Sequence, residues 1–290
     1  MIAETLSRGR AEWSLRRVRR SVEAGTPNAP GRSAWIEHRR RALTGALVAP
    51  ADRRRQARTA WAFLAAAVAG VIAGVYITPA IGSLAALVAA TGSLAALTRS
   101  RTEPGTVAWW RDRTIACWET AAALGPLEAL GWTVLHDRAV PGTDTVVDHL
   151  LIGPSGIWAL SSERTYGSLR KVDGRWWYTR SFGHLVEEVG SQAAALAGRH
   201  VADTLGDVAR DAGLNSVHRV LAVWGAGVPD EGLISDGVFV VAGDRLATMI
   251  ASFAPVASPE ALGPVVAAAH ERLPQVFTDH VPGSGALSPP

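Results

Sequence analysis

A run of 40 residues from Thr59 to Thr98 without one charged or histidine side chain constrains this chain more than any other feature. One helix needs about 20 apolar residues to cross a bilayer, so the run is long enough for two. Pro79 lies near its centre and favours a turn, because proline has no backbone donor and disfavours helix in the residue before it. The run therefore predicts a transmembrane helical hairpin with spans at about 60–77 and 80–98. A soluble alanine-rich hairpin is the alternative.

Arginines flank this run on both sides, at Arg53, Arg54, Arg55, Arg58, Arg99 and Arg101. Loops rich in arginine stay on the cytoplasmic side of a membrane. We therefore expect a multi-pass protein of the cell membrane with both termini cytoplasmic.

The net charge of +3 conceals a strong asymmetry along the chain. Residues 1–60 carry 14 arginines against 5 acids, whereas residues 103–290 carry 13 bases against 21 acids. We expect a basic cytoplasmic arm over 1–58, an acidic globular domain over 103–273, and a disordered tail rich in Pro, Gly and Ser over 274–290. The arm is expected to attract anionic lipid or nucleic acid. A solvated arm that only sets the topology is the alternative.

Beyond residue 103 the pattern alternates between helical and strand periodicity. It predicts helices over 112–130, 184–206, 243–252 and 258–272, strands over 131–137, 146–152, 156–162, 218–225 and 237–243, and a hairpin over 168–180. The fold class that follows is α/β, of the α+β type, with a mixed sheet and helices on its faces. The single cysteine, Cys117, excludes an internal disulfide framework.

Three motifs occur in order in this region: LEALGWTVLHDRAVPG at 127–142, VVDHLLIGPSGIWAL at 146–160 and RTYG at 164–167. By these motifs the stretch from Trp109 to about Leu205 resembles the NERD (nuclease-related) domain, whose fold is similar to that of PD-(D/E)xK restriction nucleases. The resemblance implies a restriction-endonuclease-like fold, here preceded by the two predicted transmembrane helices.

In nucleases of that fold, carboxylates hold Mg²⁺, which activates a water, and a lysine stabilises the developing charge. The resemblance places Asp148 at the first acid position, Ser161 at the second acid position and Glu163 at the lysine position. Cys117 stands where the family has an upstream glutamate. Residues two apart on a strand share a face, so we expect Asp148, Ser161 and Glu163 to face one cleft.

These departures predict a degenerate nuclease site and an interaction or regulatory role. Together with the expected hairpin they predict a membrane-anchored cytoplasmic domain. The alternative is a metal-dependent DNA or RNA nuclease with a variant motif, in which Asp148 and Glu163 share Mg²⁺. No other cofactor is expected.

The predicted 168–180 hairpin and the residues before it interleave basic and aromatic side chains. That pattern is typical of single-strand nucleic-acid binding, and its candidate residues are Arg164, Arg170, Lys171 and Arg175, beside Trp176, Trp177 and Tyr178. An ordinary hairpin with core aromatics and solvated arginines is the alternative.

Overall fold

The computed structural model describes residues 15–24, 26, 28–43, 105–172, 175–179, 185–188 and 190–276. The chain divides into two compact units, residues 1–38 together with 109–290, and residues 39–108. Of the second unit, residues 39–43 and 105–108 are described, and they are helical. Of the described residues before 39, those at 15–24, 26 and 28–38 fall in the same unit as 109–276.

The expected membrane topology is corrected by the structure. Among the helices in the described part of the chain, none is both long enough and apolar enough to cross a membrane. That finding contradicts the expectation of a multi-pass protein of the cell membrane. The two spans predicted at 60–77 and 80–98 themselves lie outside the described residues.

The globular unit alternates helices and strands in the order that its pattern predicts, with shifted boundaries. The elements are α4 (Gly105–Glu128), β1 (Thr133–Ala139), β2 (Val146–Gly153), β3 (Gly156–Val172), β4 (Arg175–Thr179), β5 (Leu185–Glu188), α5 (Ser191–Asp211), β6 (Val217–Gly227), β7 (Leu233–Ser235), β8 (Val238–Ala242), the 3-10 turn η2 (Gly243–Arg245), α6 (Leu246–Ala251) and α7 (Pro259–Arg272). Helical residues 15–23 and 32–43 precede them.

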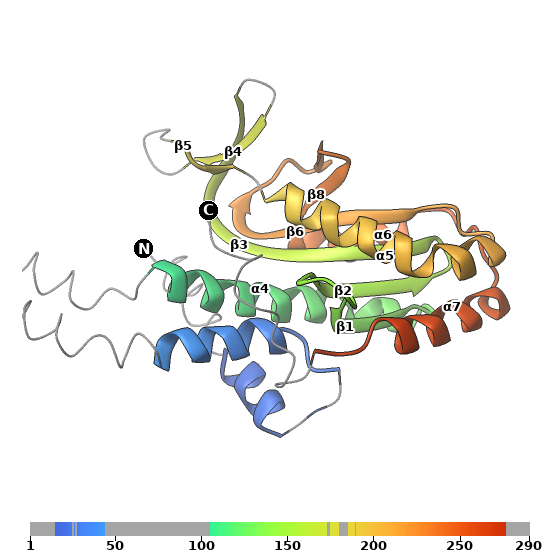
Figure 1. Cartoon of the computed structure of the whole chain (residues 1–290). Helices are drawn as coiled ribbons and strands as arrows, with labels where there is room; N and C mark the ends of the chain where they lie inside the picture. The colour runs from blue at the N-terminus through green and yellow to red at the C-terminus, as the bar shows by residue number, and fades with distance from the viewer. Residues whose placement is uncertain are drawn as a thin grey trace, which may run out of the picture. The chain divides into compact units, whose positions relative to one another are not determined.

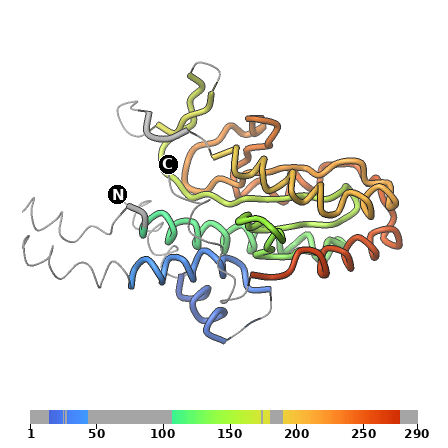
Figure 2. Tube along the Cα trace, in the orientation of Figure 1, coloured from blue at the N-terminus to red at the C-terminus, as the bar shows by residue number. Residues whose placement is uncertain are grey.

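The strands form one mixed sheet, in the order β1-β2-β3-β6-β8-β7. The first three strands are an antiparallel meander, and β6 and β8 then add in parallel. β4 pairs with the far end of β3, and β5 pairs with β4, so these two strands lie off the main path (Figure 1). Figure 2 shows the same view as a tube, coloured from blue at the N-terminus to red at the C-terminus.

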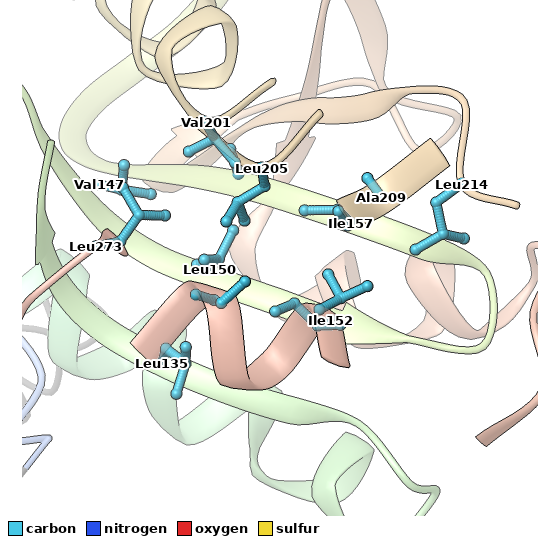
Figure 3. Packing of buried hydrophobic residues seen from close by; sticks show 14 of the residues in the cluster. Leu135, Val147, Leu150, Ile152, Ile157, Val201, Leu205, Ala209, Leu214 and Leu273 are labelled. Atoms are coloured by element: carbon cyan, nitrogen blue, oxygen red, sulfur yellow. The ribbon is translucent and has the colours of Figure 1, made fainter. Parts of the chain in front are cut away.

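Helices cover both faces of this sheet. One buried cluster joins α5 and α7 to β2 and β3, through residues such as Val201, Leu205, Val265, Leu150 and Ile157 (Figure 3). A second cluster, on the other face, joins α4 and α6 to Leu151, Trp158 and Leu160 of the same strands. Successive residues of a strand point to opposite faces, which is why Leu150 and Leu151 belong to different clusters. The predicted α/β fold with helices on both faces of a mixed sheet is confirmed.

The outer edge of the sheet, strand β1, is covered by segments from both ends of the chain. The Asn28 side chain donates to the Val134 carbonyl (3.0 Å) and accepts from the His136 backbone N–H (2.7 Å), as a neighbouring strand would. The backbone of Pro274 and Val276 pairs with Ala139 and Asp137 of the same strand. Exposed strand edges invite unwanted pairing, and this cover prevents it. Residues 274–276 therefore pair with the sheet, while the rest of the expected tail, 277–290, lies outside the described residues.

Replacing Asn28 by alanine is expected to destabilise the globular unit by about 1–3 kcal/mol. The substitution leaves a donor and an acceptor of β1 unpaired, and Asn28 has a left-handed φ of 57°, which alanine tolerates less well. Urea unfolding of the full chain measures the loss. The matched control is Asn215→Ala, at an exposed loop position. Equal stabilities of the two variants would show that the N-terminal cover contributes nothing.

Candidate functional site

The acid of the Asp-His motif lies near the start of β2, where the regular alternation of side chains breaks. Val147 and Leu150 both belong to the cluster under α5 and α7, although they are three residues apart. Asp148, between them, contacts α4 on the opposite face. On the neighbouring strand Asp137 has a left-handed φ of 51°, and the paired register passes from His136 directly to Arg138. The Asp148 carboxylate therefore points toward α4 because of a local irregularity. Regular alternation along β2 would place it on the same face as Leu150, toward α5 and α7.

Both carboxylate oxygens of Asp148 have partners within the protein. The Arg113 guanidinium donates to Oδ1 at 2.7 Å, and the backbone N–H of Ser162 donates to Oδ2 at 2.8 Å. The Asp148 side chain is 1% exposed and that of Arg113 is 13% exposed. Burial alone would lower the pKa of Arg113, but the adjacent Asp148 raises it, so the pair is a buried ion pair.

Helix α4 supplies the rest of this site from one stripe. Arg113, Cys117, Thr120, Leu124 and Leu127 follow at intervals of three or four residues, so all face the sheet. Burial, and next the Asp148 carboxylate, raise the pKa of the Cys117 thiol well above its usual value. A neutral thiol is a poor metal ligand, because the thiolate is the form that binds metal.

Thr120 joins α4 to two strands through its hydroxyl. Its Oγ1 accepts from the Ser162 hydroxyl and from the indole N–H of Trp224, each at 2.9 Å. Both serine and threonine are fully engaged inside the protein, at 1% and 0% exposure. The residue of β3 that accompanies Asp148 is therefore Ser162, which the sequence analysis did not single out.

Ser161 and Glu163 point away from Asp148. On β3, Leu160 and Ser162 contact the α4 side, whereas Ala159 packs under α5, so the odd-numbered residues face α5. Glu163 accepts a 3.1 Å hydrogen bond from the Tyr178 hydroxyl and lies near Gly190, just before α5. The expected convergence of Asp148, Ser161 and Glu163 on one cleft is not found, because the alternation breaks at Asp148 but continues along β3.

The basic residues proposed for nucleic acid fall into two groups. Arg164 forms an ion pair with Glu119 of α4, and its side chain is 5% exposed, so it is occupied within the fold. Arg170, Lys171 and Arg175 are exposed on the strands beyond. Glu119 lies two residues after Cys117 and so on a different side of α4. Its carboxylate nevertheless contacts the sheet, because it pairs with Arg164 of β3.

Two histidines and an aspartate lie together beside the site. His136 and His149 lie opposite each other on β1 and β2, and their Nδ1 atoms are 2.7 Å apart. Burial, and then the neighbouring His149, lower the pKa of His136 to about 2. Burial, and then Arg113, lower the pKa of His149 to about 3. Both rings are therefore neutral at pH 7, and the Nδ1–H of one ring donates a hydrogen bond to the Nδ1 of the other.

Asp137 anchors the N-terminal segment to this corner of the sheet. Its carboxylate accepts from the backbone N–H of Arg32 (2.8 Å) and Ser33 (3.2 Å), and from the Ser33 hydroxyl. These donors belong to the first turn of the helix over 32–43, so Asp137 caps that helix from a distant strand. Burial raises the pKa of Asp137 to about 6, although the bonds from Ser33 and Arg32 oppose that shift.

The donor set does not fit the magnesium site that the resemblance implies. Asp148 and Glu163, the two expected ligands, lie on opposite faces of the sheet. Across the described ranges, no three His, Cys, Asp or Glu side chains are grouped so that they could hold a metal ion. Magnesium is usually held by carboxylates together with substrate phosphates, and here one buried carboxylate is already paired with arginine.

Residues 114–222 match the family model described as "Nuclease-related domain" (NERD). The matched stretch runs from within α4 into β6, and it contains Asp148, Cys117 and Ser162 but begins one residue after Arg113. Comparison with curated proteins and with solved structures found no match. The family match supports the resemblance drawn from the sequence motifs.

Proposed function

We propose that this nuclease-related domain is an interaction module that does not hydrolyse nucleic acid. The observation that carries the proposal is the engagement of Asp148, whose two oxygens accept from Arg113 and from the Ser162 backbone. Arg113 neutralises the carboxylate that a metal would need. On this proposal the fold serves as a scaffold, and the Arg113 guanidinium compensates the charge of Asp148 in place of a metal ion.

The surroundings of Asp148 support the same proposal. Hydrolysis by this kind of site needs a metal to activate water and a cation beside the scissile phosphate. Here the neighbouring Cys117 is a neutral thiol, and Ser162 and Thr120 are bonded to each other. None of these groups would hold a divalent ion or take a proton from water at neutral pH.

A cleavage assay on the purified full chain tests the proposal. Labelled single-stranded DNA, duplex DNA and RNA are incubated with Mg²⁺ or Mn²⁺, and Asp148→Asn is purified in parallel to identify contaminating nucleases. The expected result is no cleavage above that of Asp148→Asn. Cleavage by the wild type that Asp148→Asn abolishes would overturn the proposal and establish a variant nuclease motif.

A second variant examines the two positions at which the family carries its acid and lysine. The double substitution S161D/E163K restores the family residues, but on the face that Asp148 does not share. We therefore expect it to remain inactive. Metal-dependent cleavage by S161D/E163K would show that these side chains do meet Asp148 and would contradict the geometry on which the proposal rests.

A further inference from the structure

The far end of β3 leaves the main sheet and carries a small sheet of its own. β3 is 17 residues long, and its register with β6 shifts between Arg164 and Gly167. At this bend β6 has Gly225, with a φ of 85°, where a Cβ would lie 2.6 Å from the Thr165 carbonyl. Glycine is needed at that close approach. Beyond the bend, β4 and β5 stand clear of the main body of the sheet (Figure 1).

The two faces of the β3–β4 ribbon differ in character. Leu169 and Trp176 pack against the buried cluster that contains Tyr178, so one face is turned to the core. The register pairs Ser168 with Thr179, Arg170 with Trp177, and Val172 with Arg175, and side chains of paired residues share a face. We call the face that these six residues share the outer ribbon face; Thr179, at its end nearest the main sheet, is buried. The outer ribbon face carries two exposed arginines beside a half-buried tryptophan, and no acid is among its six residues.

We propose that the outer ribbon face binds single-stranded nucleic acid. Trp177 would stack with a base, while Arg170 and Arg175 contact the phosphates on either side. Base stacking on aromatic rings combined with a basic track is how proteins hold single strands without reading their sequence. The inference rests on the proposed function, since it names the partner of a domain that binds and does not cut.

The distribution of charge favours binding at this ribbon over binding spread across the surface of the domain. Residues 103–290 as a whole carry 13 bases and 21 acids, so most of this domain repels a polyanion. Phosphate contacts dominate nucleic-acid affinity, and the strand must therefore follow the basic face. Lys171 pairs with Trp176 and so belongs to the other face of the ribbon, with its Nζ 5.9 Å from the centre of the Trp176 ring, which leaves Arg170 and Arg175 as the cations of the outer ribbon face.

Fluorescence anisotropy with the full chain and labelled single-stranded DNA and RNA oligonucleotides tests the inference. Trp177→Ala is expected to weaken binding by about 5- to 100-fold. The double substitution R170A/R175A is expected to weaken it and to flatten the plot of log affinity against log salt, by about 0.7 in slope for each phosphate that an arginine no longer neutralises. Arg199→Ala, at an exposed position of α5, is the matched control and should bind like the wild type.

One further variant keeps the test decisive. Trp177→Phe retains a stacking ring and should bind almost as well as the wild type, which separates stacking from any misfolding of the ribbon. Near-ultraviolet circular dichroism confirms that each variant is folded.

Three outcomes would overturn the inference. The first is no binding of single strands. The second is binding that Trp177→Ala and R170A/R175A leave unchanged, which would place it on the arginine-rich N-terminal region. The third is binding of anionic vesicles that compete with the oligonucleotide and are insensitive to Trp177→Ala, which would identify a lipid surface. Because cleavage is assayed separately, loss of this partner leaves the proposal of a non-hydrolytic domain standing.

Discussion

Replacing Arg113 by alanine should lower the free energy of unfolding by about 3–5 kcal/mol. The substitution removes the guanidinium but leaves Asp148 in place, with 1% of its side chain exposed. An ionised carboxylate without a partner is strongly unfavourable in such surroundings, since the one remaining N–H donor, from Ser162, does not neutralise its charge. Natural domains have total stabilities of about 5–15 kcal/mol, so this change alone could unfold a large fraction of the protein. Chemical denaturation monitored by tryptophan fluorescence measures it.

The matched control for this variant is Arg111→Ala, two residues earlier on the same helix. Arg111 also pairs with an aspartate, Asp112, but its side chain is 37% exposed, and pairs in such positions contribute less than about 1 kcal/mol. The double substitution R113M/D148N removes both charges together, and we expect it to be clearly more stable than Arg113→Ala. An Arg113→Ala variant as stable as the Arg111→Ala control would contradict the buried ion pair.

The sheet and its helices could be predicted because their residues follow regular periods. The run before Gly153-Pro154-Ser155-Gly156 and the run after it are rich in branched side chains, and they pair as β2 and β3. The helix predicted over 112–130 is α4, which begins earlier, at Gly105, and ends at Glu128. The predicted hairpin at 168–180 is present, although its first strand is continuous with β3. The helix expected from 184 begins only at Ser191, because residues 185–188 pair with β4 instead.

The orientation of the site could not be predicted, because it depends on one break in periodicity. Strict alternation makes residues 161 and 163 partners of Asp148. The left-handed Asp137 on the adjacent strand, and the switch of Asp148 toward α4, bring Ser162 to it instead. No glycine or proline marks this irregularity in the sequence, and an aspartate, although it tolerates a positive φ, is also common elsewhere. The match to the family motifs therefore placed β2 and β3 correctly. It did not predict that Ser162, and not Ser161 or Glu163, lies on the same side as Asp148.

Contacts between segments far apart in the chain also could not be predicted from the sequence. Asn28 lies 108 residues before the His136 N–H that it binds, and Ser33 lies 104 residues before Asp137. Local patterns carry no information about such pairs, and the Pro- and Gly-rich surroundings of Asn28 indicated only a loop. The arginine-rich composition of the N-terminal region further suggested a solvated arm, whereas a small polar residue within it completes the edge of the sheet.

The buried corner formed by His136, His149 and Asp137 predicts a steep loss of stability in mild acid. In the unfolded chain both histidines take up protons as the pH falls through about 6.5, whereas in the folded protein their pKa values are lowered to about 2 and about 3. Asp137 acts in the opposite sense, because its pKa is raised to about 6, so the folded protein holds its proton over a range in which the unfolded chain does not. From about pH 6 to pH 4 the unfolded chain therefore binds two protons more at the histidines and one fewer at the aspartate.

One net proton corresponds to a loss of about 1.4 kcal/mol for each pH unit, or about 3 kcal/mol between pH 6 and pH 4. Urea unfolding at a series of pH values measures this slope, and three variants assign it. His149→Gln removes one histidine and should bring the slope close to zero, while Asp137→Asn removes the opposing group and should nearly double it. His270→Gln, exposed on α7, should leave it unchanged. A wild-type stability that stays level from pH 6 to pH 4, or a slope that His149→Gln does not alter, would mean that the two imidazoles accept protons inside the fold. The acid response would then have to come from another part of the chain.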